Sequence, residues 1–458
     1  MKILLVVHCF FPDHFYGTET YTLELARDLR RRGHVVEILS TMSYGESGGR
    51  GERLFSYQYD DFPIHCVDYN FFPPATFRET YYRPETRSFY RKLLAGFGPE
   101  IIHVTHLMNH TAVLLEAARD CGIPALATLT DFFPLCFNAH LSGPDGELCP
   151  GPDGGDCLEC YLRVYGEESL KGSGLLADWF RRPNRRRLLT ALSARLGSLP
   201  VIGNGGPWKR VREITGRAAI IRQAYSIFHY LVTPTDFLRD AYLANHFPAP
   251  KLVKNNFGIN WQVVADWRTI RSRPEASRPL RFGYIGQLVE HKGVDLLVEA
   301  FTGLKGRREL LLYGSFAPGS PFKERLEELI AGVSGIAFAG TFPETELGRR
   351  LSELDVLVIP SRWYENSPLV LLYALATRTP VIVSDVKGMT EFVWHRKNGL
   401  TFARGSRSGL AAAMQEFCDR PELVTELSRH ADYNRKIADH VGVIVDLYRK
   451  IVVEYSDR

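Results

Sequence analysis

A short polar loop followed by a helix start is the segment of this sequence best suited to bind an anion. In PSRWYENSPLVLLYALA, Glu365 directly precedes Asn366 and Ser367, and Pro368 follows. Serine is a favoured N-cap and proline a favoured first helical residue, so the sequence predicts a helix that begins at Ser367 and Pro368. Because unpaired amides and the positive dipole end of a helix bind anions, we expect a diphosphate site at Asn366 and Ser367. The alternative is that Glu365 is a solvated loop carboxylate.

Four of the eight cysteines lie within 25 residues, at Cys136, Cys149, Cys157 and Cys160. Their spacing is C-x12-C-x7-C-x2-C, in a segment too rich in Gly, Pro and Asp to be held by an apolar core. Four thiolates around one zinc ion would fix such a segment, and the ion would be structural because no coordination position stays open. Two disulfides are the alternative, which a cytosolic location disfavours.

A basic stretch follows the cysteines. Its arginines are Arg181, Arg182, Arg185, Arg186 and Arg187, with Trp179 and Phe180 beside them, and KRVRE begins at Lys209. Such a segment could contact an anionic membrane surface or a lipid-linked phosphate, or it could be a solvated helix face. The formal net charge of +4 gives no general indication of nucleic-acid binding, and we expect none.

These residues need a scaffold, and apolar strand patterns alternate with helix patterns from the first residue. KILLVV, TYTLELARDLRRRG and HVVEIL begin one series, and a second series runs from RFGYIG through VDLLVEAF, ELLLYG and DVLVIP to PVIVS. This alternation predicts an α/β protein with two Rossmann-like, doubly wound parallel-sheet domains. If the domains face each other across a cleft, functional residues should lie directly after strands.

The expected domain boundaries follow from composition. WRTIRSRPEASRPL is polar, contains Pro274 and Pro279 and has no clear period, so it reads as a linker. We expect a first domain over residues 1–264 with a cysteine-rich insert at 136–160, a second domain over 265–435, and a helix over 436–458 that crosses back to the first domain.

The apolar segments also bear on location. MKILLVV is short and no small-residue cleavage site follows, so it predicts a buried strand rather than a secretory signal. No apolar run approaches the ~18 to 20 residues of a membrane span. We expect a cytoplasmic protein, with peripheral contact at the inner face of the membrane as a further expectation.

The segment around Glu365 resembles the retaining, nucleotide-sugar-dependent enzymes of glycosyltransferase family four. That family carries a Glu, seven residues and a second Glu after a PS-containing strand end, followed by a Pro-Val strand. The resemblance implies that Glu365 contacts the donor sugar near the reacting carbon. Tyr373 stands at the position of the second Glu, so ribose recognition is altered or moves to Tyr373; the alternative is that Tyr373 only packs.

GYIGQLVEHKGVDLLVEAF is similar to the family's strand, Gly-Arg-Leu turn, Lys-Gly and helix. Gly286 would let the backbone approach a phosphate, and Lys292 would balance the diphosphate as a point charge. Gln287 occupies the usual Arg position, which leaves more of the charge to Lys292. A turn glycine and an exposed lysine are the alternative.

In the first domain, FFPDHFYGTETYTLELARDLRRRGHVVEIL is similar to the family's Pro-rich loop, Gly-Gly and helix. Gly17 would bring backbone amides to the diphosphate or acceptor, although Thr18 replaces the second glycine. A turn glycine without a ligand is the alternative.

Two further segments of this domain resemble the family at strand ends. IIHVTHL places His106, and less strongly His103, where a histidine would orient or protonate a sugar hydroxyl; each could instead pack. In PALATLTDFFPLC, Thr130 stands where the family has a donor-contacting histidine, and Asp131 would accept a hydroxyl instead or simply initiate a turn.

The resemblance implies a B-type glycosyltransferase. It would transfer a hexosyl group from a UDP-, GDP- or ADP-linked sugar to a hydroxyl of a glycan or lipid-linked acceptor, with retention of configuration and without a catalytic metal. The departures at Thr130, Gln287 and Tyr373 leave two alternatives. One is a nucleotide-sugar-binding protein with weak or no transferase activity, and the other is a phosphorylase or epimerase on the same scaffold.

Overall fold

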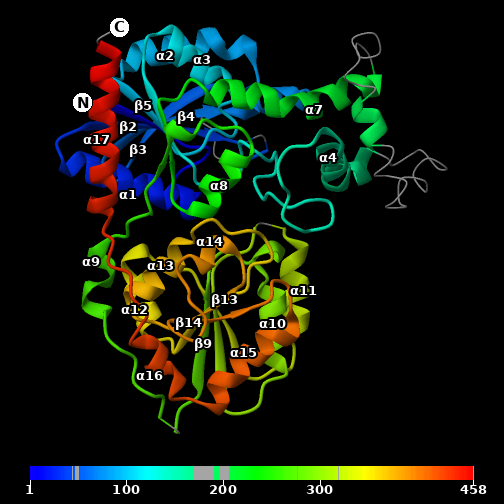
Figure 1. Ribbon diagram of the computed structural model, residues 1–458, viewed down its shortest axis with the longest axis vertical. Coiled ribbons are helices and arrows are strands. Elements are labelled where there is room, and N and C mark those ends of the chain that lie inside the picture. The colour runs from blue at the N-terminus through cyan, green and yellow to red at the C-terminus, as the bar shows by residue number, and fades with distance from the viewer. Residues whose placement is uncertain are drawn as a thin grey trace. The chain divides into compact units, whose positions relative to one another are not determined.

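The protein folds into two compact units, shown in a computed structural model that describes residues 1–43, 45–46, 51–169, 190–195, 206–275, 277–317 and 319–456 (Figure 1). Unit 1 comprises Met1–Pro234, Leu238–Lys254 and Val443–Arg458, and unit 2 comprises Thr235–Phe237 and Asn255–Gly442. Each unit contains one of the predicted parallel sheets. The change of unit after Lys254 lies ten residues before the predicted boundary.

Unit 1 contains, within the described residues, an eight-stranded sheet in the order β3-β4-β2-β1-β5-β6-β7-β8. Apart from the antiparallel pair β3 and β4, neighbouring strands are parallel. The strands are β1 (Lys2–Val6), β2 (Val35–Met42), β3 (Leu54–Tyr59), β4 (Phe62–Asp68), β5 (Ile101–Val104), β6 (Ala125–Thr128), β7 (Tyr230–Thr233) and β8 (Leu252–Lys254). The chain winds from β1 toward β2 on one side and toward β5 on the other, so β1 and β5 flank a topological switch point, where ligands of such sheets bind.

Helices connect the strands of unit 1, as parallel strands require. They are α1 (Gly17–Arg31), α2 (Arg87–Phe97), α3 (Val113–Asp120), α4 (Gly154–Ser169), α7 (Gly206–Tyr225) and α8 (Asp236–Ala244). The first three present buried apolar side chains to the core, such as Leu25 in α1, Leu94 in α2 and Leu114 in α3. No helix in the described ranges is both long and apolar enough to cross a membrane.

Unit 2 contains, within the described residues, a six-stranded sheet in the order β11-β10-β9-β12-β13-β14. All neighbouring strands are parallel. They are β9 (Leu280–Ile285), β10 (Arg308–Tyr313), β11 (Ile336–Gly340), β12 (Val356–Ile359), β13 (Val381–Ser384) and β14 (Gly399–Phe402). This is the 3-2-1-4-5-6 order of dinucleotide-binding sheets, and its switch point lies between β9 and β12.

The helices of unit 2 cover this sheet around a continuous apolar core that includes Phe282, Phe301 and Phe417. They are α9 (Trp261–Val264), α10 (Val294–Thr302), α11 (Pro321–Ile330), α12 (Leu347–Ser352), α13 (Leu369–Ala376), α14 (Lys387–Thr390), α15 (Arg407–Asp419) and α16 (Leu423–Ser428). α13 is apolar on all sides and almost fully buried, which fits a helix surrounded by protein.

The segment predicted to be a linker is instead part of unit 2. Arg271 is buried and donates to the Thr379 hydroxyl at 2.9 Å, and Arg278 forms a bidentate ion pair with Asp355 at 2.6 and 2.7 Å. The segment has no regular period because its arginines are fixed by partners distant in the sequence. Its polar composition therefore suggested a solvated hinge where the protein has packed structure.

The C-terminal helix α17 (Ile437–Ser456) belongs to unit 1 from Val443 onward. Tyr448 is fully buried, and its hydroxyl lies 2.6 Å from Nδ1 of His103 in β5. The helix is thus part of the core of unit 1.

Candidate active site

The switch point of unit 2 brings Lys292 and Glu365 together. Lys292 ends a 3-10 turn (Glu290–Lys292) between β9 and α10, and Glu365 lies in the loop after β12. Lys292 Nζ is 2.7 Å from Glu365 Oε1, and the Ser361 hydroxyl donates to the same oxygen at 2.6 Å. The ammonium also lies 4.3 Å from the centre of the Trp363 ring. The two motifs that the sequence singles out therefore form one cluster.

The charge of Glu365 depends on this cluster. The side chain is buried, and burial alone would raise the pKa of Glu365, but the Lys292 ammonium and the hydrogen bonds from Lys292 and Ser361 lower it further than burial raises it. The pKa is consequently below its usual value, and Glu365 is a carboxylate at neutral pH. A solvated loop carboxylate, the alternative from sequence, does not describe this residue.

Two glycines, Gly293 and Gly388, allow close backbone contacts beside Lys292 and Glu365. Gly293 has φ +73°, and a Cβ there would lie 2.1 Å from the carbonyl oxygen of Pro360. A Cβ on Gly388 would lie 1.8 Å from the carbonyl oxygen of Glu365. Only glycine permits these close approaches, so the turn with Lys292 and the loop with Glu365 are packed backbone to backbone.

The helix after Glu365 begins later than the sequence predicts. α13 starts at Leu369, its N-cap is Pro368, and no side chain caps it. The Ser367 hydroxyl is therefore not a cap; it is buried and has no hydrogen-bonding partner among the described residues. Asn366 Oδ1 accepts a hydrogen bond from the Thr235 hydroxyl at 2.6 Å. An uncapped helix start beside an unpaired hydroxyl keeps the features of an anion site.

The turn after β9 differs in detail from the expectation. The Gly286 amide donates to the carbonyl of Tyr313 at 3.0 Å, so this amide is used within the sheet rather than offered to a phosphate. Gly286 is exposed, and the Tyr284 hydroxyl donates to the carbonyl of Gln287 at 2.6 Å. Gly286 thus shapes an exposed turn, and Gln287 follows it, half-buried.

Tyr373 lies inside unit 2. Its side chain is 3% exposed, and its hydroxyl accepts a hydrogen bond from the Asn260 amide at 3.1 Å. A ribose would need a hydroxyl that reaches the surface. The geometry therefore favours the packing alternative for Tyr373 over the ribose-binding one.

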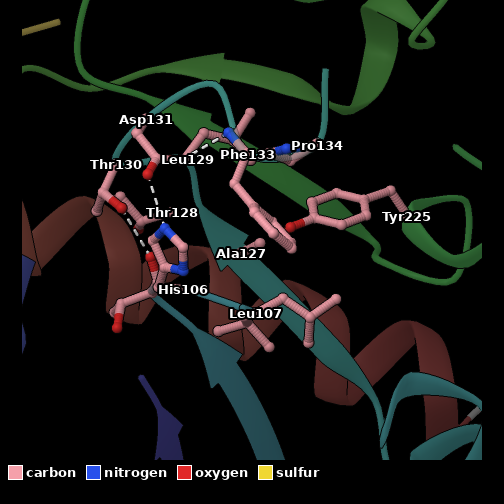
Figure 2. A pocket seen from close by; sticks show the side chains of 12 residues that line it. His106, Leu107, Ala127, Thr128, Leu129, Thr130, Asp131, Phe133, Pro134 and Tyr225 are labelled. Carbon is pink, nitrogen blue, oxygen red and sulfur yellow. Dashed lines mark hydrogen bonds and ion pairs between the residues drawn. The ribbon is translucent and has the colours of Figure 1, made fainter. Parts of the chain in front are cut away.

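In unit 1, His106 and Asp131 line a hollow at the carboxyl ends of β5 and β6 (Figure 2). His106 Nε2 lies 2.7 Å from Asp131 Oδ2, and the Met108 amide donates to His106 Nδ1 at 3.2 Å. Because Nδ1 accepts, the proton of the neutral ring resides on Nε2 and points to Asp131. Both ring nitrogens are thus occupied, which argues against the expected direct role of His106 on a sugar hydroxyl.

Asp131 remains available for a further hydrogen bond. Its Oδ1 accepts from the Phe133 amide at 2.8 Å, its Oδ2 faces His106, and 24% of its side chain is exposed. A carboxylate accepts about four hydrogen bonds. The turn-initiating role and the hydroxyl-binding role of Asp131 are therefore compatible, with His106 as the group that orients the carboxylate.

The structure favours the alternative interpretation for the two other candidate residues of unit 1, His103 and Gly17. His103 is fully buried between the Tyr448 hydroxyl at 2.6 Å and the Thr128 hydroxyl at 2.8 Å, so it packs, as its alternative states. Gly17 is the first residue of α1 and is exposed, and a Cβ there would touch nothing within 4 Å. No contact with the described residues of unit 1 requires glycine at this position.

The sequence interpretation overlooked three residues at the unit 1 switch point, His8, Cys9 and Glu19. Each offers one atom that could bind a metal ion, and these three atoms lie within 4.8 Å of one another. Within the described ranges, no other group of three or more His, Cys, Asp or Glu side chains does so. The signal was present, because His8 and Cys9 directly follow β1 and Glu19 is a buried acid in the first turn of α1.

The four cysteines of the insert are free thiols in this structure, which does not contain the disulfides of the alternative. Cys157 and Cys160 lie on α4, and burial together with the nearby Cys136, Cys149 and Cys160 thiols raises the pKa of Cys157 to about 12. Among the described residues, however, no three of these four sulfurs lie within 4.8 Å of one another. The Cys136 thiol donates to Asn138 Oδ1 at 2.8 Å instead.

The basic residues predicted to contact a membrane lie outside the described residues. These are Trp179, Phe180, Arg181, Arg182, Arg185, Arg186 and Arg187. Lys209 is described and is exposed on α7. Contact with a membrane stays a prediction.

Curated relatives match about half of the chain, whereas solved structures match nearly all of it. The amylovoran biosynthesis glycosyltransferase AmsK of Erwinia amylovora is 26% identical over an alignment of 212 residues that covers 42% of this chain and 51% of the relative. The chain thus spans about half the length of the curated relatives that it matches first.

Among solved structures, sucrose-phosphate synthase from Thermosynechococcus elongatus has a TM-score of 0.63 at 17% identity and covers 99% of both chains. HepE from Anabaena, in complex with UDP and glucose, has a TM-score of 0.62 at 14% identity and covers 98% of this chain and 100% of HepE. These likenesses confirm the predicted fold class of two parallel-sheet α/β domains.

Family models match each unit separately. The model described as Glycosyltransferase Family 4 matches residues 15–151 in unit 1, and the model described as Glycosyl transferases group 1 matches residues 279–420 in unit 2. Together they span more than half of the chain, and the resemblance inferred from the motifs is confirmed. The chain belongs to the family-four and group 1 glycosyltransferases.

Proposed function

We propose that the protein transfers a hexosyl group from a nucleotide-diphosphate sugar to a hydroxyl of a glycan or lipid-linked acceptor, with retention of anomeric configuration. The observation that carries the proposal is the Lys292–Glu365 pair at the switch point of unit 2, beside the uncapped start of α13. A diphosphate leaving group develops negative charge, and in this proposal the Lys292 ammonium and the amides at the start of α13 stabilise it.

Each residue has a separate role in this proposal. Lys292 and the α13 amides bind the diphosphate, and Glu365 holds Lys292 in place and accepts a hydroxyl of the donor sugar. Asp131 accepts a sugar hydroxyl in unit 1, oriented by His106. The leaving phosphate oxygen takes the proton of the attacking hydroxyl, so the transfer needs neither a protein base nor a catalytic metal.

The donor is best sought first among UDP-sugars, because the HepE structures contain UDP with glucose or UDP-glucose. The decisive experiment is a thermal-shift and hydrolysis screen of the purified protein against UDP-, GDP-, ADP- and dTDP-sugars. One nucleotide sugar should raise the melting temperature and be hydrolysed slowly, and Lys292→Ala and Glu365→Ala should lose both responses.

Matched variants separate loss of the site from loss of stability. Asp355→Ala removes another buried, paired carboxylate of unit 2, from the amino end of β12, and should destabilise the protein while the donor response persists. If no donor shifts the melting temperature of the wild-type protein, the transferase proposal fails. A donor shift without hydrolysis, with any acceptor tried, would favour the nucleotide-sugar-binding alternative.

The insert adds a separate proposal, a structural zinc ion bound by Cys136, Cys149, Cys157 and Cys160. Their number, their spacing and their mutual proximity around Cys157 support it, and binding requires the sulfurs to leave their present hydrogen bonds. Metal analysis of Cys157→Ser should then show one zinc ion fewer per chain than wild type. Equal zinc contents would refute the proposal.

The place of the protein in the cell is likewise a proposal. We infer a cytoplasmic enzyme that touches the anionic inner face of the membrane through its basic stretch. Co-sedimentation with vesicles that contain phosphatidylglycerol, and not with neutral vesicles, would support this contact.

A further inference from the structure

His8, Cys9 and Glu19 meet at the switch point of unit 1, where β1 ends and α1 begins. His8 Nε2 is 3.3 Å and Cys9 Sγ is 3.0 Å from the same oxygen, Glu19 Oε1. The backbone holds His8 in place, since its carbonyl accepts a hydrogen bond from the Thr41 hydroxyl of β2. One nitrogen, one sulfur and one oxygen donor therefore converge within 4.8 Å of one another.

The carboxylate of Glu19 is buried and only partly hydrogen-bonded. Glu19 is 1% exposed, and its second oxygen, Oε2, has no hydrogen-bonding partner among the described residues. In the described part of the chain its ion pair is with the His8 imidazole. A buried carboxylate oxygen without a partner is costly unless a positive charge joins it.

We propose that His8, Cys9 and Glu19 bind one divalent transition-metal ion of the zinc type. Imidazole nitrogen, thiolate sulfur and carboxylate oxygen are the donors that zinc prefers, whereas Mg²⁺ and Ca²⁺ prefer oxygen alone. On binding, the Cys9 thiol releases its proton to solvent. The thiolate and the Glu19 carboxylate then neutralise the two positive charges of the ion, so the buried group as a whole becomes uncharged.

The His106 ring packs against this group. It lies 4.2 Å from the His8 ring, centre to centre, and is fixed in turn by Asp131. Nδ1 of His8 has no hydrogen-bonding partner among the described residues, and Nε2, which faces Glu19, is the nitrogen that would bind the ion. Three protein ligands leave one coordination position for water or another ligand. The inference does not rest on the proposed transfer reaction, whose charges come from Lys292 and α13.

Cobalt binding tests the site, because Co²⁺ replaces zinc and absorbs light when a thiolate binds it. Wild-type protein, Cys9→Ser and Cys66→Ser would be titrated with Co²⁺ after removal of bound metal. Cys66 is the matched control, a buried cysteine of β4 that packs with Met42 and Phe55. We expect Cys9→Ser to bind one Co²⁺ fewer per chain, with weaker thiolate absorption, and Cys66→Ser to match wild type. Equal stoichiometry in wild type and Cys9→Ser would overturn the proposal.

A second variant keeps the test decisive if Cys9→Ser does not fold. Glu19→Gln preserves the size of the side chain and removes its charge, and it should weaken Co²⁺ binding by at least about tenfold. Circular dichroism would verify folding. Cys136→Ser shows which equivalent belongs to the cysteine insert, since that variant should keep the equivalent that Cys9→Ser loses. An unchanged affinity in folded Glu19→Gln would also overturn the proposal.

Discussion

At the switch point of unit 2, the buried carboxylate of Glu365 lies 2.7 Å from the Lys292 ammonium, whereas at the switch point of unit 1 the buried carboxylate of Glu19 faces an imidazole and a thiol that burial keeps neutral. The same sheet topology thus supports two electrostatic solutions. Unit 2 supplies its own counter-charge and keeps an amide-rich helix start for an anion. Unit 1 gathers acceptors, which suit a cation or the hydroxyls of a sugar.

Removal of the counter-charge in unit 2 should have the largest effect. Lys292→Ala is expected to lower kcat/KM for donor hydrolysis by about 10²- to 10³-fold, the usual effect of losing one group that stabilises developing charge. Steady-state kinetics would measure it. Lys397→Ala is the control, since Lys397 also lies over a tryptophan ring, 4.9 Å from the centre of Trp394, but is exposed and outside the site. A similar loss of kcat/KM in both variants would show that Lys292 has no specific role in donor hydrolysis.

In unit 1 the corresponding test is Asp131→Asn, with a smaller expected effect. A hydrogen bond to a charged group contributes about 1.5–3 kcal/mol, so kcat/KM for donor hydrolysis should fall by roughly tenfold to a hundredfold. Asp120→Asn is the control, because it changes an exposed carboxylate of unit 1 that pairs with Arg87. If Asp131→Asn has wild-type kinetics, the Asp131 carboxylate initiates a turn and does not bind a sugar hydroxyl.

Tyr373→Phe distinguishes packing from ribose recognition. Because the hydroxyl is bound to the Asn260 amide, its loss should cost about 0.5–1.5 kcal/mol in the free energy of unfolding and change donor affinity by less than about threefold. Chemical denaturation and donor titration would give the two quantities. A tenfold weaker donor affinity at unchanged stability would restore the ribose-binding interpretation.

The smallest effect is the pH dependence of stability. The pKa of Glu365 is lower in the folded than in the unfolded protein, so its contribution is fully present above the unfolded pKa, about 4.3. That contribution is lost as the pH falls through the lower folded value. The free energy of unfolding should therefore fall more steeply with acid in wild type than in Glu365→Gln. Parallel pH profiles would show that the ion pair does not stabilise the fold.

The sequence predicts the two sheets and the residues that follow their strands because alternating apolar runs and breakers are local signals. The helix-start signal singled out the loop with Glu365, and the family resemblance singled out Lys292; each residue lies after a strand that flanks the unit 2 switch point. What remained hidden depends on partners distant in the sequence. The Gly286 amide donates to the Tyr313 carbonyl, and His106 Nε2 faces Asp131.

Burial likewise reversed two sequence interpretations. Arg271 looked like part of a solvated linker, yet it is buried against Thr379. Ser367 looked like a helix cap, yet α13 begins at Leu369. In both cases the residue type fits several roles, and tertiary packing decides among them.

The discontinuity of unit 1 has a consequence for how the protein is made. Tyr448 and Ile451 of α17 are fully buried in unit 1, but a ribosome synthesises them after the whole of unit 2. Unit 1 therefore lacks part of its core while unit 2 is synthesised, and His103 forms its hydrogen bond with Tyr448 only afterwards. Unit 2 is nearly continuous along the chain and precedes this part of α17, so the core of unit 1 closes only after the chain of unit 2 has been made.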